Sequence, residues 1–245
     1  MLIKNIAPVI LTLCLTFFSY SQSNGKAYYK KTSSHNFKLS KESGNNANAS
    51  KLFKSVNNSI SDMEFILTFN NSLASYEYIK KLDVDENSST AQFNRVFSGY
   101  SGPYYYNFKT NNVTRKQGAY LIKKQLSSFD WVLTKEKLII NDLTCYKATT
   151  IIKQQGRRGE LLKPAVAWYT VDINLSSGPD GFGGLPGLII QLEFDKVVTT
   201  LEKIEFLDKH IDIKLPTKGK KMTEAEFDAL MKDMVENRDK YYDKN

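Results

Sequence analysis

Apolar and polar side chains alternate in short runs through most of the chain, and this period of two predicts β-strands. Residues 26–32 (KAYYKKT) form the first such run. Residues 63–82 predict a hairpin, because two alternating runs flank Asn70-Asn71, a pair that favours a tight turn. The polar stretch 33–60 between these elements predicts only a short helix, around Ala49–Lys54.

The same alternation continues to residue 207. Residues 104–110 and 119–126 predict a second hairpin with a turn at NNVT, and Asn141-Asp142 predicts the turn of a third. Further strands are expected at 165–173, 187–195 and 197–207. Consecutive strands joined by short polar turns predict a mainly β fold, either a single curved antiparallel sheet or a half-open barrel.

The pattern changes to a helical period near the C-terminus. Thr223-x-x-Glu226 is a capping box, which predicts a helix start. An apolar stripe follows at steps of three and four residues: Phe227, Leu230, Met231 and Met234, with Arg238 and Tyr241 beyond. We expect a C-terminal amphipathic helix whose stripe packs on the sheet, rather than a helix on a membrane surface.

The N-terminus predicts an export signal. Lys4 precedes an apolar run from Ile6 to Phe18, and Ser19-x-Ser21 has the form of a signal-peptidase site. We therefore expect residues 1–21 to be a signal peptide, residues 22–245 a single domain, and the product periplasmic or secreted. Cys14 lacks the small neighbours of a lipidation site, so no lipoprotein is expected, and no other segment predicts a transmembrane helix.

Composition limits the chemistry that is open to this domain. Of 245 residues, 41% are hydrophobic, which is enough for one core. Without Cys14, Cys145 has no disulfide partner and is expected to be a buried, inert thiol. Its pairing with His35 or His210, and a metal site built on them, is not expected, nor is any cofactor. The net charge of +8 is scattered, with KGKK at 218–221 as the densest cluster, and predicts no nucleic-acid partner.

Glycine and proline concentrate in the stretch SGPDGFGGLPGLIIQLEF, residues 177–194. It lacks the Lys-Ser/Thr pair of a phosphate loop, and a strand follows it where a dinucleotide fingerprint needs a helix. Leu185-Pro186-Gly187-Leu188 predicts a type II turn, and Gly178–Gly181 a turn just before it. We interpret the stretch as a structural corner with glycines where backbones approach closely.

The hexapeptide GLPGLI, Gly184 to Ile189, is the naming motif of the GLPGLI family of exported Gram-negative proteins, which this chain resembles. Further features of that family occur in the same order, namely Trp131, CYKAT (145–149), AWYT (167–170) and Gly178-Pro179. The resemblance covers mainly the second half of the chain. The segment KQQGRRGELLKP departs from it by its length and basic character. The family has no established activity, so the resemblance implies export and a β-rich fold but no reaction.

Two function classes remain open. The first is a non-enzymatic binding or accessory module of the cell envelope, with an outer-membrane or other envelope protein or an apolar ligand as its partner. Its candidate binding residues are aromatic: Trp168, Tyr169 and Phe182 would lie near the mouth of a groove, and Tyr104 and Tyr105 would belong to a second exposed aromatic patch. Burial of the same aromatics in the core is the competing interpretation. The family motif, made of Gly184, Leu185, Pro186, Gly187, Leu188 and Ile189, is assigned a structural role and no catalytic one.

The second class is an envelope hydrolase, which would need paired carboxylates or a nucleophile with a base. Spacing alone does not bring the candidates together: Asp172, Asp180, Glu193 and Asp195. A cleft with converging carboxylates would favour the hydrolase, and an apolar groove without ionisable pairs would favour the binding module.

Overall fold

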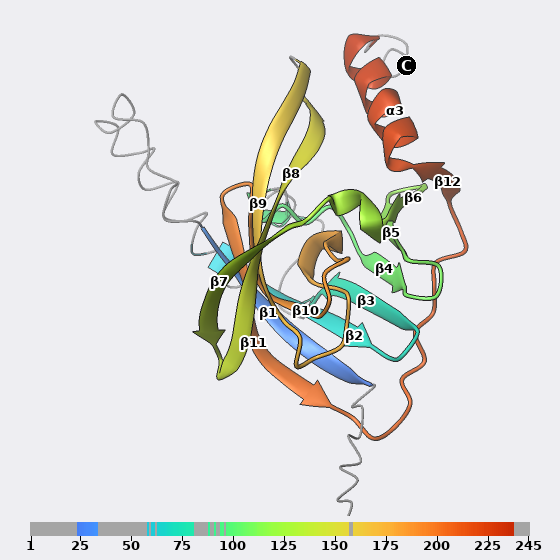
Figure 1. Ribbon diagram of the computed structural model, residues 1–245. Coiled ribbons are helices and arrows are strands. Elements are labelled where there is room, and N and C mark those ends of the chain that lie inside the picture. Colours follow the sequence, from blue (N-terminus) through green and yellow to red (C-terminus); the bar gives the residue numbers. More distant parts are fainter. Residues whose placement is uncertain are drawn as a thin grey trace, which may run out of the picture.

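The computed structural model describes residues 24–33, 63–80, 97–156 and 159–237, together with a few isolated positions between 58 and 95. The expected signal peptide, the short helix at 49–54, Arg238 and Tyr241 lie outside the described residues. The structure is mainly β, and the twelve strands of the described residues belong to one large sheet (Figure 1).

The first half of the chain forms one meander on one side of β1 (Gly25–Ser33). Its strands follow in sequence order: β2 (Glu64–Phe69), β3 (Leu73–Tyr78), β4 (Tyr104–Asn107), β5 (Asn112–Gln117) and β6 (Tyr120–Gln125). The hairpin predicted at 63–82 is confirmed, and the Asn70 side chain accepts hydrogen bonds from the backbone of Ser72 and Leu73 in its turn. The second predicted hairpin is wrong in its pairing, because β5 lies between β4 and β6; of the predicted turn NNVT, Asn111 ends the turn and the other three residues open β5.

The second half forms another meander on the other side of β1. Its strands are β7 (Val132–Ile140), β8 (Leu143–Gly156), β9 (Gly159–Thr170), β10 (Leu188–Phe194) and β11 (Val197–Phe206). The turn predicted at Asn141-Asp142 is confirmed, since both residues have positive φ, as a two-residue hairpin turn requires. β1 pairs with β2 on one side and β11 on the other, so it joins the two meanders into a single sheet.

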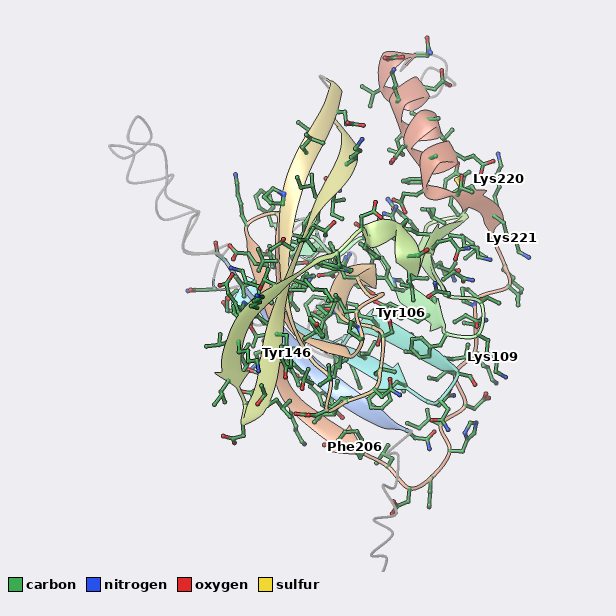
Figure 2. The ribbon with its side chains drawn as sticks, viewed as in Figure 1. Tyr106, Lys109, Tyr146, Phe206, Lys220 and Lys221 are labelled. Carbon is green, nitrogen blue, oxygen red and sulfur yellow. The ribbon has the colours of Figure 1, made fainter. Side chains whose placement is uncertain are left out.

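The sheet curves without closing into a barrel, which confirms the predicted fold class. β12 (Lys220–Thr223) runs parallel to β6, so the sheet is mixed rather than purely antiparallel. The 3-10 turn η2 (Leu126–Phe129) links β6, near one end of the sheet, to β7 at the other end. The hydroxyl of Thr150 on β8 donates to the carbonyl of Phe129 and so holds η2 against the second meander. Lys220 and Lys221 of the KGKK cluster are exposed and lie in β12 (Figure 2).

The hydrophobic core fills the concave side of the sheet. Its fully buried members include Tyr29, Phe65, Tyr76 and Tyr106, and Figure 2 shows Tyr106 pointing inward. The segment between β9 and β10 carries the 3-10 turn η3 (Pro179–Gly181) and lies inside the curve, against β3, β4 and β5 (Figure 1). This segment between β9 and β10, residues 171–187, is therefore an internal plug between the two meanders.

The C-terminal helix α3 (Glu224–Glu236) begins at Thr223 with the predicted capping box. Only Phe227 of its predicted stripe is buried, against Tyr120, Ile122 and Met222. Met231 is 39% exposed, so the prediction that the whole stripe packs on the sheet is wrong. The helix projects past the edge of the sheet, and the distal part of the β8–β9 hairpin projects on the same side of the molecule (Figure 1). No described helix has the length and apolarity needed to span a membrane.

Candidate functional site

The internal plug is held by side-chain donors from strands and turns on both sides of it. The Tyr106 hydroxyl donates to the carbonyl of Gly178 at 2.6 Å, and the Tyr29 hydroxyl donates at 2.8 Å to the carbonyl of Ile189 in β10, directly after the plug. The Trp131 indole donates to the carbonyl of Gly183 at 2.8 Å. Because these carbonyls are buried, each needs such a partner, and the aromatic donors fix the path of the plug.

The family motif itself makes a tighter bend than predicted. The amide of Gly187 donates to the carbonyl of Leu185 at 2.8 Å, which makes a three-residue turn around Pro186. The amide of Leu188 donates to Ile173 instead of closing a type II turn, so that detail of the prediction is wrong. Glycines do lie where backbones approach closely, since a Cβ on Gly187 would lie 1.8 Å from the carbonyl oxygen of Thr170.

A buried ion pair joins the plug to β1. The Lys31 ammonium lies 2.7 Å from both carboxylate oxygens of Asp180, and it also donates to the carbonyl of Ser98 at 2.9 Å. Lys31 is fully buried and its ammonium lies 4.6 Å from the centroid of the Phe65 ring. Desolvation lowers the pKa of Lys31 and raises that of Asp180, while each charge opposes the shift of its partner.

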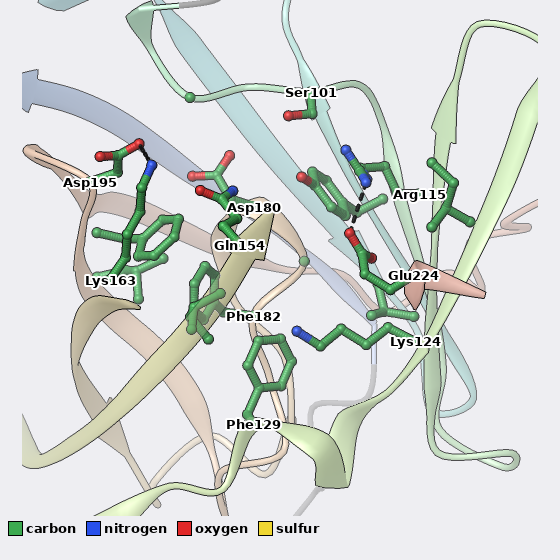
Figure 3. A pocket seen from close by; sticks show the side chains of 18 of the residues that line it. Ser101, Arg115, Lys124, Phe129, Gln154, Lys163, Asp180, Phe182, Asp195 and Glu224 are labelled. Atoms are coloured by element: carbon green, nitrogen blue, oxygen red, sulfur yellow. Dashed lines mark hydrogen bonds and ion pairs between the residues drawn. The ribbon is translucent and has the colours of Figure 1, made fainter. Parts of the chain in front are cut away.

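Asp180 also faces a pocket of about 490 Å³ beside the plug (Figure 3). The walls come from β5 and β6, the β8–β9 hairpin, the β10–β11 turn, the plug and α3. Five aromatic side chains contribute to the lining: Tyr104, Phe129, Phe182, Phe194 and Phe227. Eight ionisable side chains join them: Arg115, Lys124, Lys153, Lys163, Asp180, Asp195, Glu224 and Asp228.

Most of these charges are already paired. Arg115 bonds Glu224 at 2.9 Å, and Lys163 bonds Asp195 at 2.5 Å (Figure 3). Asp228 makes no ion pair within the described part of the chain, and desolvation followed by the nearby Glu224 charge raises its pKa. The pocket is thus neither a purely apolar groove nor an open cluster of free carboxylates.

The structure brings two of the five predicted binding residues to this pocket. Tyr104 and Phe182 line it, with Phe182 buried in the plug. Trp168, Tyr169 and Tyr105 are not among its lining residues; Tyr169 is buried, and the other two are half-buried on β9 and β4. The assignment of these residues to binding stays a prediction.

Of the carboxylates considered for hydrolysis, Asp180 and Asp195 line the pocket, whereas Asp172 and Glu193 do not. Sequence reasoning missed Lys31, Arg115, Lys124, Glu224 and Asp228. For Lys31 a signal was present, because Ala27, Tyr29 and Lys31 occupy the same face of an alternating strand. A lysine in the apolar register of a strand indicates a buried charge that needs a partner.

The fold and the pocket define a class of protein, an open β-sheet that holds a turn-rich plug and, beside it, a pocket lined by aromatic and charged side chains. The family model for a protein of unknown function (Porph_ging) matches residues 153–191, which include the plug and the hexapeptide. This match confirms the resemblance of the chain to the GLPGLI family over that segment. No curated protein matches the chain.

Solved structures share the fold. Two crystal structures of PNGF-II, in space groups P21 and C2, each superimpose with a TM-score of 0.51 over 87% of this chain, at 14% and 15% identity. The chain spans about a third of the length of those proteins, 33% and 32%. LprF from Mycobacterium bovis gives a TM-score of 0.26 at 8% identity over 80% of this chain and 90% of LprF, a score too low to support a shared fold.

Proposed function

We propose that this protein is an exported, non-enzymatic binding module of the cell envelope whose ligand site is the pocket between the plug and α3. The pocket volume of about 490 Å³ is the observation that carries the proposal, because it falls in the range of small-molecule sites. Its aromatic lining suits a ligand with an apolar body, and its polar groups would orient that body.

The arrangement of the carboxylates favours binding over hydrolysis. Asp180, Asp195 and Glu224 each accept a hydrogen bond from a lysine or arginine, so their oxygens are already engaged by a neighbouring side chain. The alternative, an envelope hydrolase, would rest on Asp228, whose raised pKa suits a general acid. Release of 4-nitrophenol from glycoside or ester substrates by the wild type, abolished in Asp228→Asn, would support that alternative.

The test of the proposal uses N-phenyl-1-naphthylamine, an uncharged apolar dye that fluoresces on leaving water. We expect the protein to bind this dye saturably, with one dye molecule per chain. Ser101→Trp should weaken this binding by about tenfold or more, because Ser101 lines the pocket and an indole would fill it. Ser127→Trp is the matched control, since Ser127 is exposed on η2 and does not line the pocket. Equal dye affinity in the two variants, or no binding to the wild type, would refute the pocket as the site.

A further inference from the structure

Of the lysines that line the pocket, Lys124 and Lys153 make no ion pair within the described residues, and Lys124 is half-buried whereas Lys153 is exposed. Lys124 extends from β6 toward the aromatic rings of Phe129 and Phe182 (Figure 3), and its ammonium lies 4.2 Å from the centroid of the Phe129 ring. It makes no hydrogen bond or ion pair within the described residues, whereas Arg115 and Lys163 both have carboxylate partners. A half-buried ammonium that lies over an aromatic ring and lacks an ion pair is incompletely compensated.

The surroundings of Lys124 disfavour its charge in the empty pocket. Desolvation lowers its pKa, Arg115 on β5 adds to that effect, and Glu224 and Asp228 on α3 oppose it. The carboxylate of Glu224 is bonded to Arg115, and burial shifts Asp228 toward its neutral form. An anion placed beside Lys124 would therefore replace lost hydration with a direct charge-assisted bond.

We propose that the ligand of this pocket is an amphipathic acid, an apolar body with one anionic head, whose head pairs with Lys124 while the body lies against Phe129, Phe182 and Phe194. This inference rests on the proposed function, because it assigns chemistry to the same pocket. Lys124 is the specificity-determining residue of that site. Leu192, which is buried and also lines the pocket, extends the apolar wall beyond the three rings.

Two dyes with the same ring skeleton, one anionic and one neutral, measure the contribution of the anionic head separately from that of the apolar body. The dye 1-anilinonaphthalene-8-sulfonate carries a sulfonate that N-phenyl-1-naphthylamine lacks. We expect Lys124→Met to weaken binding of the sulfonate dye by about tenfold and to change binding of the neutral dye by less than about twofold. Lys124→Arg should restore the sulfonate affinity, because it restores the positive charge. Lys123→Met is the matched control, since Lys123 is exposed on the opposite face of β6 and has the same formal charge.

The outcomes distinguish the two proposals. Binding of the neutral dye together with equal sulfonate affinities in wild type and Lys124→Met would overturn the inference but leave the proposed function standing. Equal losses in Lys123→Met and Lys124→Met would also overturn it, because they would indicate a diffuse charge effect. Failure of both dyes to bind the wild type would refute the proposed function itself. Displacement of the neutral dye by decanoate or by decyl phosphate, each compared with 1-decanol, then separates a carboxylate head from a phosphate head.

Discussion

Gly187 lies where the backbone of the plug crosses the end of β9. Its φ is 155°, and a Cβ would meet the Thr170 carbonyl oxygen at 1.8 Å. We expect Gly187→Ala to destabilise the protein by about 3 kcal/mol or more, because a backbone atom cannot move aside as a side chain can. Gly118→Ala is the control: its φ is 56° but the space is open, so it should cost only about 1–2 kcal/mol. Urea denaturation compares the two, and equal losses would reduce the role of Gly187 to its dihedral preference.

The Lys31–Asp180 pair locks the plug to β1. Lys31→Met should cost about 3–5 kcal/mol, because it leaves a buried carboxylate without a partner. Asp180→Asn should keep the backbone, since Asn tolerates the φ of 52° at this position. The double variant should lose less stability than the sum of the singles, by about 1 kcal/mol or more. Additive losses in a double-mutant cycle would show that the two side chains act independently.

The same pair predicts a pH dependence for the Lys31→Met variant. Burial raises the pKa of Asp180 above its ordinary value, and without Lys31 nothing opposes that shift. The folded state then retains a proton that the unfolded state releases, so stability falls as pH rises through the raised pKa. Lys31→Met should therefore be more destabilised at pH 8 than at pH 5, relative to the wild type at each pH. A pH-independent difference between variant and wild type would contradict this account of Asp180.

The reactivity of the Cys145 thiol tests whether this part of the core is closed to solvent. Its side chain is fully buried, and burial raises the pKa of the thiol to about 11. Because the thiolate is the reactive form, alkylation by iodoacetamide at pH 8 should be at least about a hundredfold slower in the folded protein than in 6 M guanidinium. Thiol reactivity in the native protein that equals the unfolded rate would place Cys145 in an exposed, reactive environment.

At the scale of elements, α3 is anchored by its first turns. Phe227 is buried and its ring lies 5.9 Å from that of Tyr120, whereas Met231 is 39% exposed. Phe227→Asp should release the helix, and Met231→Asp should change stability by less than about 0.5 kcal/mol. Hydrogen exchange over residues 224–236 reports the release directly. Equal protection in the two variants would mean that α3 is held by contacts other than Phe227.

The agreement between predicted and observed strands and helix depends on how local the determining residues are in the sequence. Alternation predicted most strands, and the capping box predicted the start of α3, because both depend on residues within a few positions of one another. β5 was missed because its run NVTRKQ is polar apart from Val113 and looks like a turn. The exposure of Met231 was missed because helical periodicity marks an apolar stripe but not the length of the surface that covers it.

At the scale of the whole molecule, the site depends on contacts that no local pattern encodes. Lys31 and Asp180 are 149 positions apart and meet only because the plug folds back under β1. The pocket likewise combines α3 and the first meander with the β8–β9 hairpin of the second. The pocket residues Lys124 and Asp228 were therefore beyond sequence reasoning, whereas a bend at Leu185–Gly187 was not, since glycine and proline carry their conformational meaning locally.

The projecting end of the β8–β9 hairpin provides a last test of how the parts cooperate. Its side chains Ile151, Leu161 and Leu162 are about half exposed or more, while Ile152 and Lys163 line the pocket. Replacing residues 151–164 by Asn-Gly would close the hairpin at the pair Thr150 and Ala165. Because the removed strand ends are mostly exposed, we expect a stability loss of no more than about 2 kcal/mol.

Binding of the neutral dye should nevertheless fall by about tenfold or more, since the pocket loses one wall. Dye affinity that survives this truncation in a folded variant would mean that the hairpin serves another surface and that the pocket is closed by the plug and α3 alone.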